Sequence, residues 1–185
     1  GLRTFNKYAP FPEEINRRIQ HAAHINNADI TIIEIGGTVG EYENILFLEA
    51  ARRMKLANPE DVSFVLVSYL PVPSHIGEMK TKPTQQASRM LNGAGIQSDI
   101  IIARSNTALD APRKEKLAVH CGVPKDHCIS APDVSSIYTI PRVMDEQHIG
   151  NKLLKTLGLK ARKTNLSRWN ALEKKTQSAK KEVRI

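Results

Sequence analysis

The stretch DIIIARS at residues 99–105 is the clearest sign of the fold, because its three consecutive isoleucines leave no polar face for water. A short apolar run bounded by polar residues is typical of a strand buried on both faces of a parallel sheet. Two further runs have the same character, DITIIE at residues 29–34 and VSFVLV at residues 62–67. We therefore expect a strand over each of the three runs.

Helical patterns alternate with these runs. Proline and acidic residues at the start of such patterns, and Asn-Gly or Gly at their ends, are typical helix boundaries. The alternation implies right-handed βαβ units and an α/β domain. The stretches expected to be helical are residues 12–24, 43–56, 84–91, 112–121 and 137–157, the last of them broken near Pro141 and Gly150.

The composition indicates one ordinary globular domain. The chain has 185 residues, of which 41% are hydrophobic and 25% charged. No apolar run reaches the roughly 20 residues that a membrane span needs, so we expect no membrane association. Cys121 and Cys128 match no CxxC spacing, and with His120 and His127 beside them they are expected to pack on a helix end and a strand. A reducing, cytoplasmic location is the expectation.

The net charge of +8 resides in the C-terminal region. Residues 152–185 contain 11 Lys or Arg and two Glu, which leaves 16 basic and 17 acidic residues upstream. This region also lacks the interleaved aromatic residues of a single-strand binder. It is therefore interpreted as a docked or extended linker with Trp169 as its one large anchor, and no nucleic-acid partner is expected.

The loop EIGGTVGEYE at residues 34–43 follows the first expected strand. Ligands of α/β folds bind beyond the carboxyl ends of strands. A carboxylate such as Glu34 could there hold a Mg²⁺ that bridges phosphates, while the glycines let backbone amides approach an anion. A plain tight turn is the alternative, and the spacing alone favours it.

The segment KTKPTQ at residues 80–85 follows the second expected strand and leads into a helix. Lysine ammonium groups beside the free amides of a helix N-terminus form an anion site, although a solvated basic loop is the alternative. After the third strand come the cations Arg104, Arg113, Lys114 and Lys116. One of these could face the same ligand, but their spacing does not select between Lys114 and Lys116.

Four motifs in order, together with the closing LSRW at residues 166–169, resemble the synthetase (amidoligase) domain of CTP synthases. They are EIGGTVG at residues 34–40, GEMKTKPTQ at 77–85, GIQSDIIIARS at 95–105 and DVSSIY at 133–138. The resemblance implies a three-layer, Rossmann-like parallel sheet of the P-loop NTPase and dethiobiotin synthetase type. It also implies a ligase that uses ATP and Mg²⁺ to phosphorylate UTP, which ammonia then converts to CTP.

The resemblance also assigns roles to matching positions. Lys80 and Lys82 would serve catalysis, Glu34 would bind Mg²⁺, and Pro132, Asp133 and Val134 would hold the adenine of ATP. The residues implied to bind UTP, or CTP as inhibitor, are Glu41, Tyr42, Glu43, Lys80, Thr81, Lys82, Pro83, Thr84, Gln85 and Lys116.

Several features depart from the family pattern. Glu41 replaces the usual Asp, Gln86 replaces the usual His, and the loop at residues 71–76 is longer. The chain contains no GxxxxGK[ST] P-loop, so the sheet is expected to be incomplete at its N-terminus. The chain is also expected to lack the family's C-terminal glutaminase, which supplies ammonia.

These departures lead us to expect a catalytically incomplete chain. Residues 1–160 are assigned to the synthetase domain and residues 161–185 to a linker toward the glutaminase, and a homo-oligomer, a tetramer in the family, is expected. A related amidoligase or nucleotide kinase, or a non-catalytic paralogue that senses nucleotides, are the alternatives.

Overall fold

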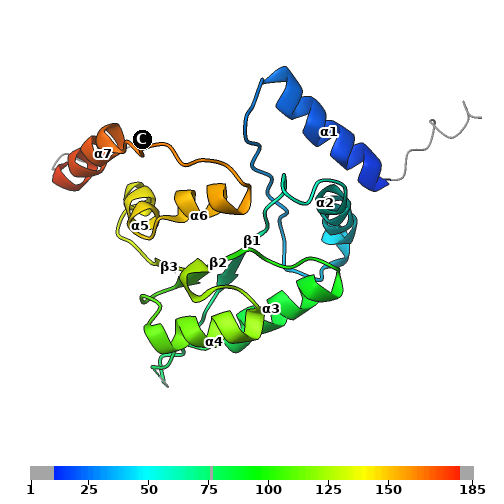
Figure 1. The fold of residues 1–185 in the computed structure, drawn as a ribbon. Coiled ribbons are helices and arrows are strands. Elements are labelled where there is room, and N and C mark those ends of the chain that lie inside the picture. Colours follow the sequence, from blue (N-terminus) through cyan, green and yellow to red (C-terminus); the bar gives the residue numbers. More distant parts are fainter. Residues whose placement is uncertain (1–10, 76, 180–185) are drawn as a thin grey trace, which may run out of the picture.

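The computed structural model describes residues 11–75 and 77–179, and it contains a parallel sheet flanked by helices (Figure 1). The sheet has the order β1-β2-β3, so β2 is its central strand. Both strand pairs are parallel. The expected α/β class with a parallel sheet is thus confirmed. The strands are β1 (Val65–Tyr69), β2 (Ile100–Ser105) and β3 (Cys128–Pro132).

Helices precede, separate and follow the strands. In Figure 1, α3 and α4 lie on one side of the sheet, and α5 and α6 lie on the other. The helices are α1 (Phe11–Ile25), α2 (Ile45–Ala57), α3 (Lys82–Gly93), α4 (Ala111–Cys121), α5 (Ile140–Glu146), α6 (Ile149–Thr156) and α7 (Ser167–Ser178).

The face of the sheet toward α3 and α4 carries the main core. Ile101 of β2 pairs with Leu66 of β1 and Cys128 of β3, and all three are buried. They belong to one apolar cluster with Leu91 of α3 and Leu117 of α4. Because side chains alternate along a strand, this register places Ile100, Ile102 and Arg104 on the opposite face.

That opposite face is covered at β3 but open at β1. The β1 residues on this face are Val65, Val67 and Tyr69, which pair with Ile100, Ile102 and Arg104 of β2. They are 37%, 60% and 55% exposed, respectively. In the described part of the chain, β1 is therefore an edge strand with one uncovered apolar face.

The prediction of a strand at residues 29–34 is wrong. This segment runs without regular structure between α1 and α2, and Ile32 is 94% exposed. A strand exists only when its backbone groups are paired with a neighbour, and the described sheet ends at β1. The segment thus has the composition of a strand, but in the described structure its backbone has no neighbouring strand with which to pair.

The other expected elements are found with shifted ends. Four helical stretches correspond to α1, α2, α3 and α4, and two of the three strand runs correspond to β1 and β2. The strand expected at the buried Cys128 is β3. In residues 137–157, Pro141 lies in the first turn of α5, where a proline is tolerated, and the break falls at His148, whose φ is +55°.

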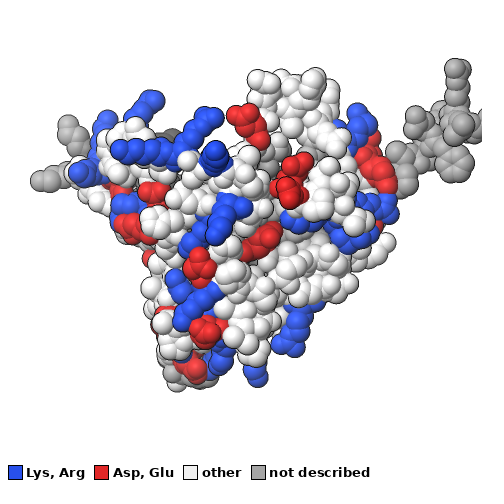
Figure 2. Space-filling view, viewed as in Figure 1, with Lys and Arg blue, Asp and Glu red and all other residues white. Residues whose placement is uncertain are grey.

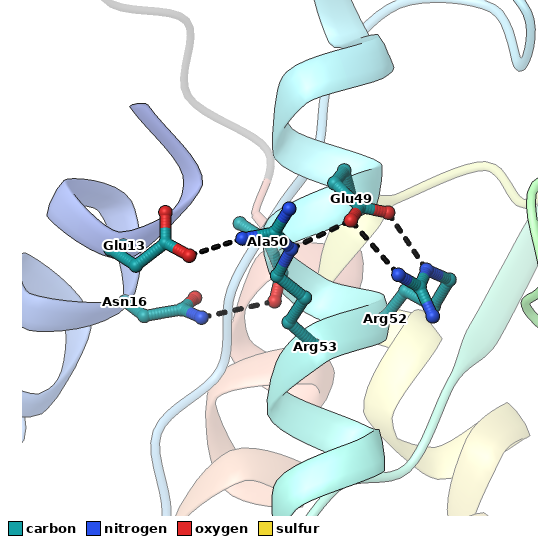
Figure 3. Close-up of polar contacts among 6 residues, drawn as sticks. All are labelled: Glu13, Asn16, Glu49, Ala50, Arg52 and Arg53. Atoms are coloured by element: carbon teal, nitrogen blue, oxygen red, sulfur yellow. Dashed lines mark hydrogen bonds and ion pairs between the residues drawn. The ribbon is translucent and has the colours of Figure 1, made fainter. Parts of the chain in front are cut away.

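Helix α1 is attached to α2 by both apolar and polar contacts. The rings of Phe11 and Phe47 meet edge to face at 5.8 Å. Figure 3 shows Arg53 of α2 between Glu13 of α1 and Glu49 of its own helix. The Asn16 side chain also donates to the backbone oxygen of Ala50 over 3.2 Å. These contacts orient α1 across α2.

The surface charge is uneven. Figure 2 shows Lys and Arg side chains gathered over α7 and the segment that leads into it, whereas acidic and basic side chains alternate over the sheet and its helices. Among the described residues, no helix has the length and hydropathy to cross a membrane.

The Glu49 cluster predicts a loss of stability in acid. Side-chain hydrogen bonds from Arg52 and Arg53 hold the pKa of Glu49 at about 2. A carboxyl whose pKa is lower in the folded state contributes stability at neutral pH, and this contribution is lost as the pH falls from about 5 toward 2. We expect Glu49→Gln to lower the urea midpoint at neutral pH and to flatten its decline in acid.

Glu60→Gln is the control for this prediction. Glu60 is exposed in the turn after α2 and has no ion pair among the described residues. An equal acid-dependent loss of stability in the wild type and in Glu49→Gln would contradict the assignment.

Candidate functional site

The carboxyl ends of the three strands are held together by hydrogen bonds. Leu70 donates its amide to the oxygen of Arg104 over 2.7 Å, and Asp133 donates to the oxygen of Ser105 over 2.8 Å. The buried Ser105 hydroxyl donates back to the oxygen of Leu70 over 2.8 Å. The chain segments that leave β1, β2 and β3 therefore start from fixed positions, and a hollow lies on each side of them.

The first of these, which we call the basic hollow, has a volume of about 160 Å³. It is formed where the first turns of α3 and α4 come together, and the segment before α3 is held there by a hydrogen bond from the Lys80 amide to the oxygen of Pro71. Its lining residues are Glu78, Met79, Thr81, Pro112, Arg113 and Lys116.

Some side chains of the predicted segment 80–85 are buried in the core, and others are exposed to solvent. Thr84 is fully buried, and its hydroxyl lies 2.8 Å from that of Ser68 on β1. Gln85 is also buried and donates to the Thr81 hydroxyl over 3.0 Å. The Thr84 side chain thus fixes α3 to the sheet, whereas the Gln85 amide donates to the oxygen of Thr81 over 3.1 Å. First-turn amides such as that of Thr84 have no acceptor within the helix and are left for a ligand. Lys80, Lys82 and Pro83 remain accessible.

The charged side chains around the basic hollow interact with one another. Lys80 donates to Glu78 over 2.8 Å, and this hydrogen bond lowers the pKa of the Glu78 carboxyl, helped by the charges of Arg113 and Lys116. Lys116 lines the hollow, whereas Lys114 does not. The structure thus makes the choice between these two lysines that the spacing left open.

The second hollow, which we call the apolar hollow, has a volume of about 90 Å³ and lies between the sheet and α5. Two of the three predicted adenine residues line it, and the third, Asp133, accepts a hydrogen bond from Arg104 over 3.0 Å. A flat aromatic ring suits such a pocket, because its walls are apolar and its rim is polar. The lining residues are Ile102, Arg104, Ala131, Pro132, Val134, Ile140, Val143 and Met144.

Helix α7 fixes the wall of the apolar hollow. The Trp169 indole donates to the backbone oxygen of Tyr138 over 2.6 Å, and the two rings lie 6.1 Å apart. Glu173 is buried and pairs with Arg142 of α5 over 3.2 Å, a contact that lowers the pKa of the Glu173 carboxyl. The region interpreted as a tail or linker therefore includes a docked helix.

The loop at residues 34–43 lies apart from the basic hollow. Gly40 has a φ of +95°, and a Cβ there would overlap the side chain of Met90 at the far end of α3. Met90 is eight residues beyond Lys82, or about 12 Å along the helix. Within one chain, therefore, the predicted nucleotide contacts at Glu41, Tyr42 and Glu43 do not join those at Lys80 and Lys116.

Glu34 and the loop around it are exposed. Tyr42 is 87% exposed, and the loop is closed by a hydrogen bond from Asn44 to the oxygen of Thr38 over 2.7 Å. The described residues contain no group of three His, Cys, Asp or Glu side chains suited to a metal ion. Glu34 alone is a hard oxygen ligand, which fits Mg²⁺ only when substrate phosphates complete the set.

The cysteines do not contribute a reactive group. Cys121 and Cys128 are free thiols in the core. Burial raises the pKa of the Cys121 thiol, and it raises that of Cys128 to about 11. Since the thiolate is the nucleophile, neither residue is suited to covalent catalysis.

Comparison with known families decides the kinship of the chain. A family model described as CTP synthase N-terminus matches residues 5–159.

The chain belongs to the CTP synthase family.

Several curated relatives share this similarity. The CTP synthase of Pyrococcus abyssi is 41% identical over 174 residues, which cover 94% of this chain and 32% of that protein. The CTP synthase of Sulfolobus acidocaldarius is 40% identical over 176 residues, covering 94% and 33%. That of Symbiobacterium thermophilum is 38% identical over 174 residues, covering 93% and 32%. The chain thus spans about a third of the length of these relatives.

Sequence reasoning did not single out some residues of the two hollows. Spacing does not rank Arg113 above the other three cations, and the GEMKTKPTQ motif gives no role to Glu78. Both follow a strand end and lie beside a helix N-terminus, which is the signal that could have identified them. Arg104 belongs to the apolar hollow, although it was considered for the same ligand as Lys116.

The docking of α7 predicts unequal effects at the two carboxylates that bind Arg142. Glu173 is buried, whereas the side chain of Glu146 is 61% exposed. We expect Glu173→Gln to lower the urea midpoint clearly, because it leaves Arg142 without its buried partner. The matched change Glu146→Gln should have little effect.

The same docking predicts that Trp169→Phe lowers the free energy of unfolding by about 1 kcal/mol, the worth of one hydrogen bond. Equal effects of Glu173→Gln and Glu146→Gln would show that α7 is not docked as described.

Proposed function

We propose that this chain is the nucleotide-binding part of a cytoplasmic CTP synthase, a ligase that forms CTP from UTP with ATP, Mg²⁺ and ammonia. The observation that carries the proposal is the basic hollow. In a chain of this family, it gathers lysine and arginine at the carboxyl edge of the sheet, where α/β folds bind nucleotides. The ammonia would come from a glutaminase domain.

The UTP or CTP triphosphate is assigned to the basic hollow. Lys116 of α4 lines the hollow, Lys80 in the segment before α3 lies beside it through its contact with Glu78, and Lys82 lies exposed at the start of α3. The first amides of a helix have no acceptor within the helix, so those of Lys82 and Thr84 can donate to phosphate oxygens. Lys80 and Lys82 would also stabilise charge in phosphoryl transfer, which depends chiefly on positioning and electrostatics.

The adenine of ATP is assigned to the apolar hollow. Pro132 and Val134 provide apolar walls, and Arg104, held by Asp133, provides a planar cation at the rim. The two hollows lie at the same edge of the sheet. This arrangement supports a reaction in which a phosphate passes from one nucleotide to the other.

Glu34 is proposed as a Mg²⁺ ligand. It is a carboxylate in a glycine-containing loop with no ion pair among the described residues. Bound there together with nucleotide phosphates, Mg²⁺ would neutralise phosphate charge. Glu34 itself would orient the ion.

The separation of the loop at residues 34–43 from the basic hollow supports a homo-oligomer. Glu41, Tyr42 and Glu43 lie toward the Met90 end of α3, and the hollow lies at the Lys82 end. A second copy that brings its loop to the hollow of the first would complete one pyrimidine-nucleotide site. A tetramer, as in the family, is the proposed state.

The open edge of β1, together with its uncovered face, supports a larger sheet of the P-loop NTPase and dethiobiotin synthetase type. Val65, Val67 and Tyr69 form an exposed apolar row on that face. Such rows are normally covered in parallel sheets. Further elements carrying the P-loop would lie on this side of β1.

Nucleotide titration distinguishes the residues of the hollow. We expect Lys116→Met to weaken UTP and CTP binding about tenfold, the cost of one charged contact to phosphate. Lys114→Met is the matched control, since it removes the same charge from the same helix outside the hollow. Isothermal titration measures both, and equal losses would contradict the assignment.

Turnover tests the activity. A protein that contains this chain together with a P-loop segment should form CTP from UTP, ATP and ammonium, as followed by chromatography of the nucleotides. The isolated chain should not hydrolyse ATP. ATP-dependent turnover of another substrate would indicate a different amidoligase, and nucleotide-dependent assembly without turnover would indicate a sensing paralogue.

A further inference from the structure

An acidic side chain occupies the basic hollow. One carboxylate oxygen of Glu78 lies 2.8 Å from the Lys80 ammonium, and the other lies 3.5 Å from the Arg113 guanidinium. Lys116 lines the same hollow. Glu78 therefore lies where an anionic ligand would meet these cations, and it cancels one of their positive charges.

Arg113 is held in place without Glu78. Its Nε donates to the oxygen of Met79 over 3.3 Å, and its Nη1 donates to the Asp110 carboxylate. Asp110 also caps α4 by accepting from the Arg113 amide over 2.9 Å. The guanidinium is thus fixed at the hollow, and its side chain is only 25% exposed.

The contact between Arg113 and Glu78 is weak by comparison. Charge-assisted hydrogen bonds of this kind are commonly about 2.7–2.9 Å long, whereas Nη2 lies 3.5 Å from the carboxylate. The Glu78 side chain is 54% exposed, so it can turn into solvent without burying its charge. Nη2 is therefore available to a stronger acceptor.

We propose that Arg113 is a further phosphate-binding residue of this hollow, and that Glu78 holds Lys80 and Arg113 in the free protein as an internal substitute for nucleotide phosphate. This inference rests on the assignment of a nucleotide triphosphate to the hollow.

The exchange of Glu78 for phosphate is favourable on general grounds. An exposed ion pair contributes little to stability, so its loss costs little. A phosphate group offers several charged oxygens, so one of them can accept a short charge-assisted hydrogen bond from Nη2 while others meet the lysines. A ligand with a single negative charge gains much less from the exchange. Glu78 therefore makes the hollow selective for polyanionic ligands such as a triphosphate.

Competition by Glu78 has a measurable consequence. If the carboxylate must leave before phosphate enters, its removal strengthens phosphate binding, whereas removal of Arg113 weakens it. When Arg113 is absent, Glu78 competes only at Lys80, so the gain from its removal becomes smaller. The two effects are then coupled in a double-mutant cycle.

The experiment titrates inorganic tripolyphosphate into the 185-residue chain and follows binding by NMR and calorimetry. We expect Arg113→Met to weaken binding about tenfold and Glu78→Gln to strengthen it roughly threefold or more. Glu115→Gln is the matched control, because Glu115 of α4 pairs with Lys125 and does not line the hollow, so the change removes the same charge elsewhere. It should change binding less than about twofold. Unfolding midpoints verify that each variant is folded.

Defined results would overturn the inference. Unchanged binding in Arg113→Met would exclude that residue as a phosphate contact. Unchanged or weaker binding in Glu78→Gln would exclude the competition, and a loss that appears only with Mg²⁺ present would make Glu78 a metal ligand instead. Absence of tripolyphosphate binding in both the wild type and Glu78→Gln would also reject it.

The same titrations with UTP, CTP and ATP separate this inference from the proposed function. Variant effects on tripolyphosphate without a preference for UTP or CTP would retain the phosphate site and remove the pyrimidine assignment. Pyrimidine-nucleotide binding that is insensitive to both variants would retain the function and reject the roles of Glu78 and Arg113.

Discussion

The pairing of β2 on both of its edges is the constraint on which both hollows depend. Ile100 and Ile101 are fully buried on opposite faces, so a shift of one residue would exchange the two faces along the whole strand. Arg104 would then leave the apolar hollow. The Ser105 hydroxyl, bonded to Leu70, fixes the end of β2 against the end of β1. The geometry of the site thus follows from strand register before any functional side chain is considered.

Hydrogen bonds to the strands fix the positions of the helix N-termini. Thr84 joins α3 to Ser68 of β1, and Ser130 of β3 accepts the amide of Leu109 just before α4. On the other face, the Gln147 side chain bonds both the amide and the oxygen of Ser130 and so occupies the outer edge of β3. These buried polar groups connect helices to strands. This role explains why several residues of the motifs that resemble CTP synthases point inward.

The sequence predicted those parts of the structure that local pattern determines. The runs at β1 and β2, and the helices α1, α2, α3 and α4, combine periodicity with boundary residues. The run at residues 29–34 has the same composition, yet it forms no strand because pairing depends on a neighbour that local pattern does not reveal. The docking of α7 likewise depends on Trp169 and Glu173 meeting residues about thirty positions earlier.

The sequence predicts a candidate site at the carboxyl ends of the strands, but it does not predict the direction of the side chains there. Lys80, Thr84 and Gln85 lie within one short segment, and each could have faced a ligand; only the packing of α3 on β1 shows that Thr84 and Gln85 are buried.

The position of Glu78 among the cations has the same origin. A chain that leaves β1 and turns back toward α3 must place some side chain beside the first turns of α3 and α4. A carboxylate there compensates the charges of Lys80 and Arg113, whereas an apolar residue would leave them uncompensated. Glu78 therefore stabilises the hollow by compensating the cations around it.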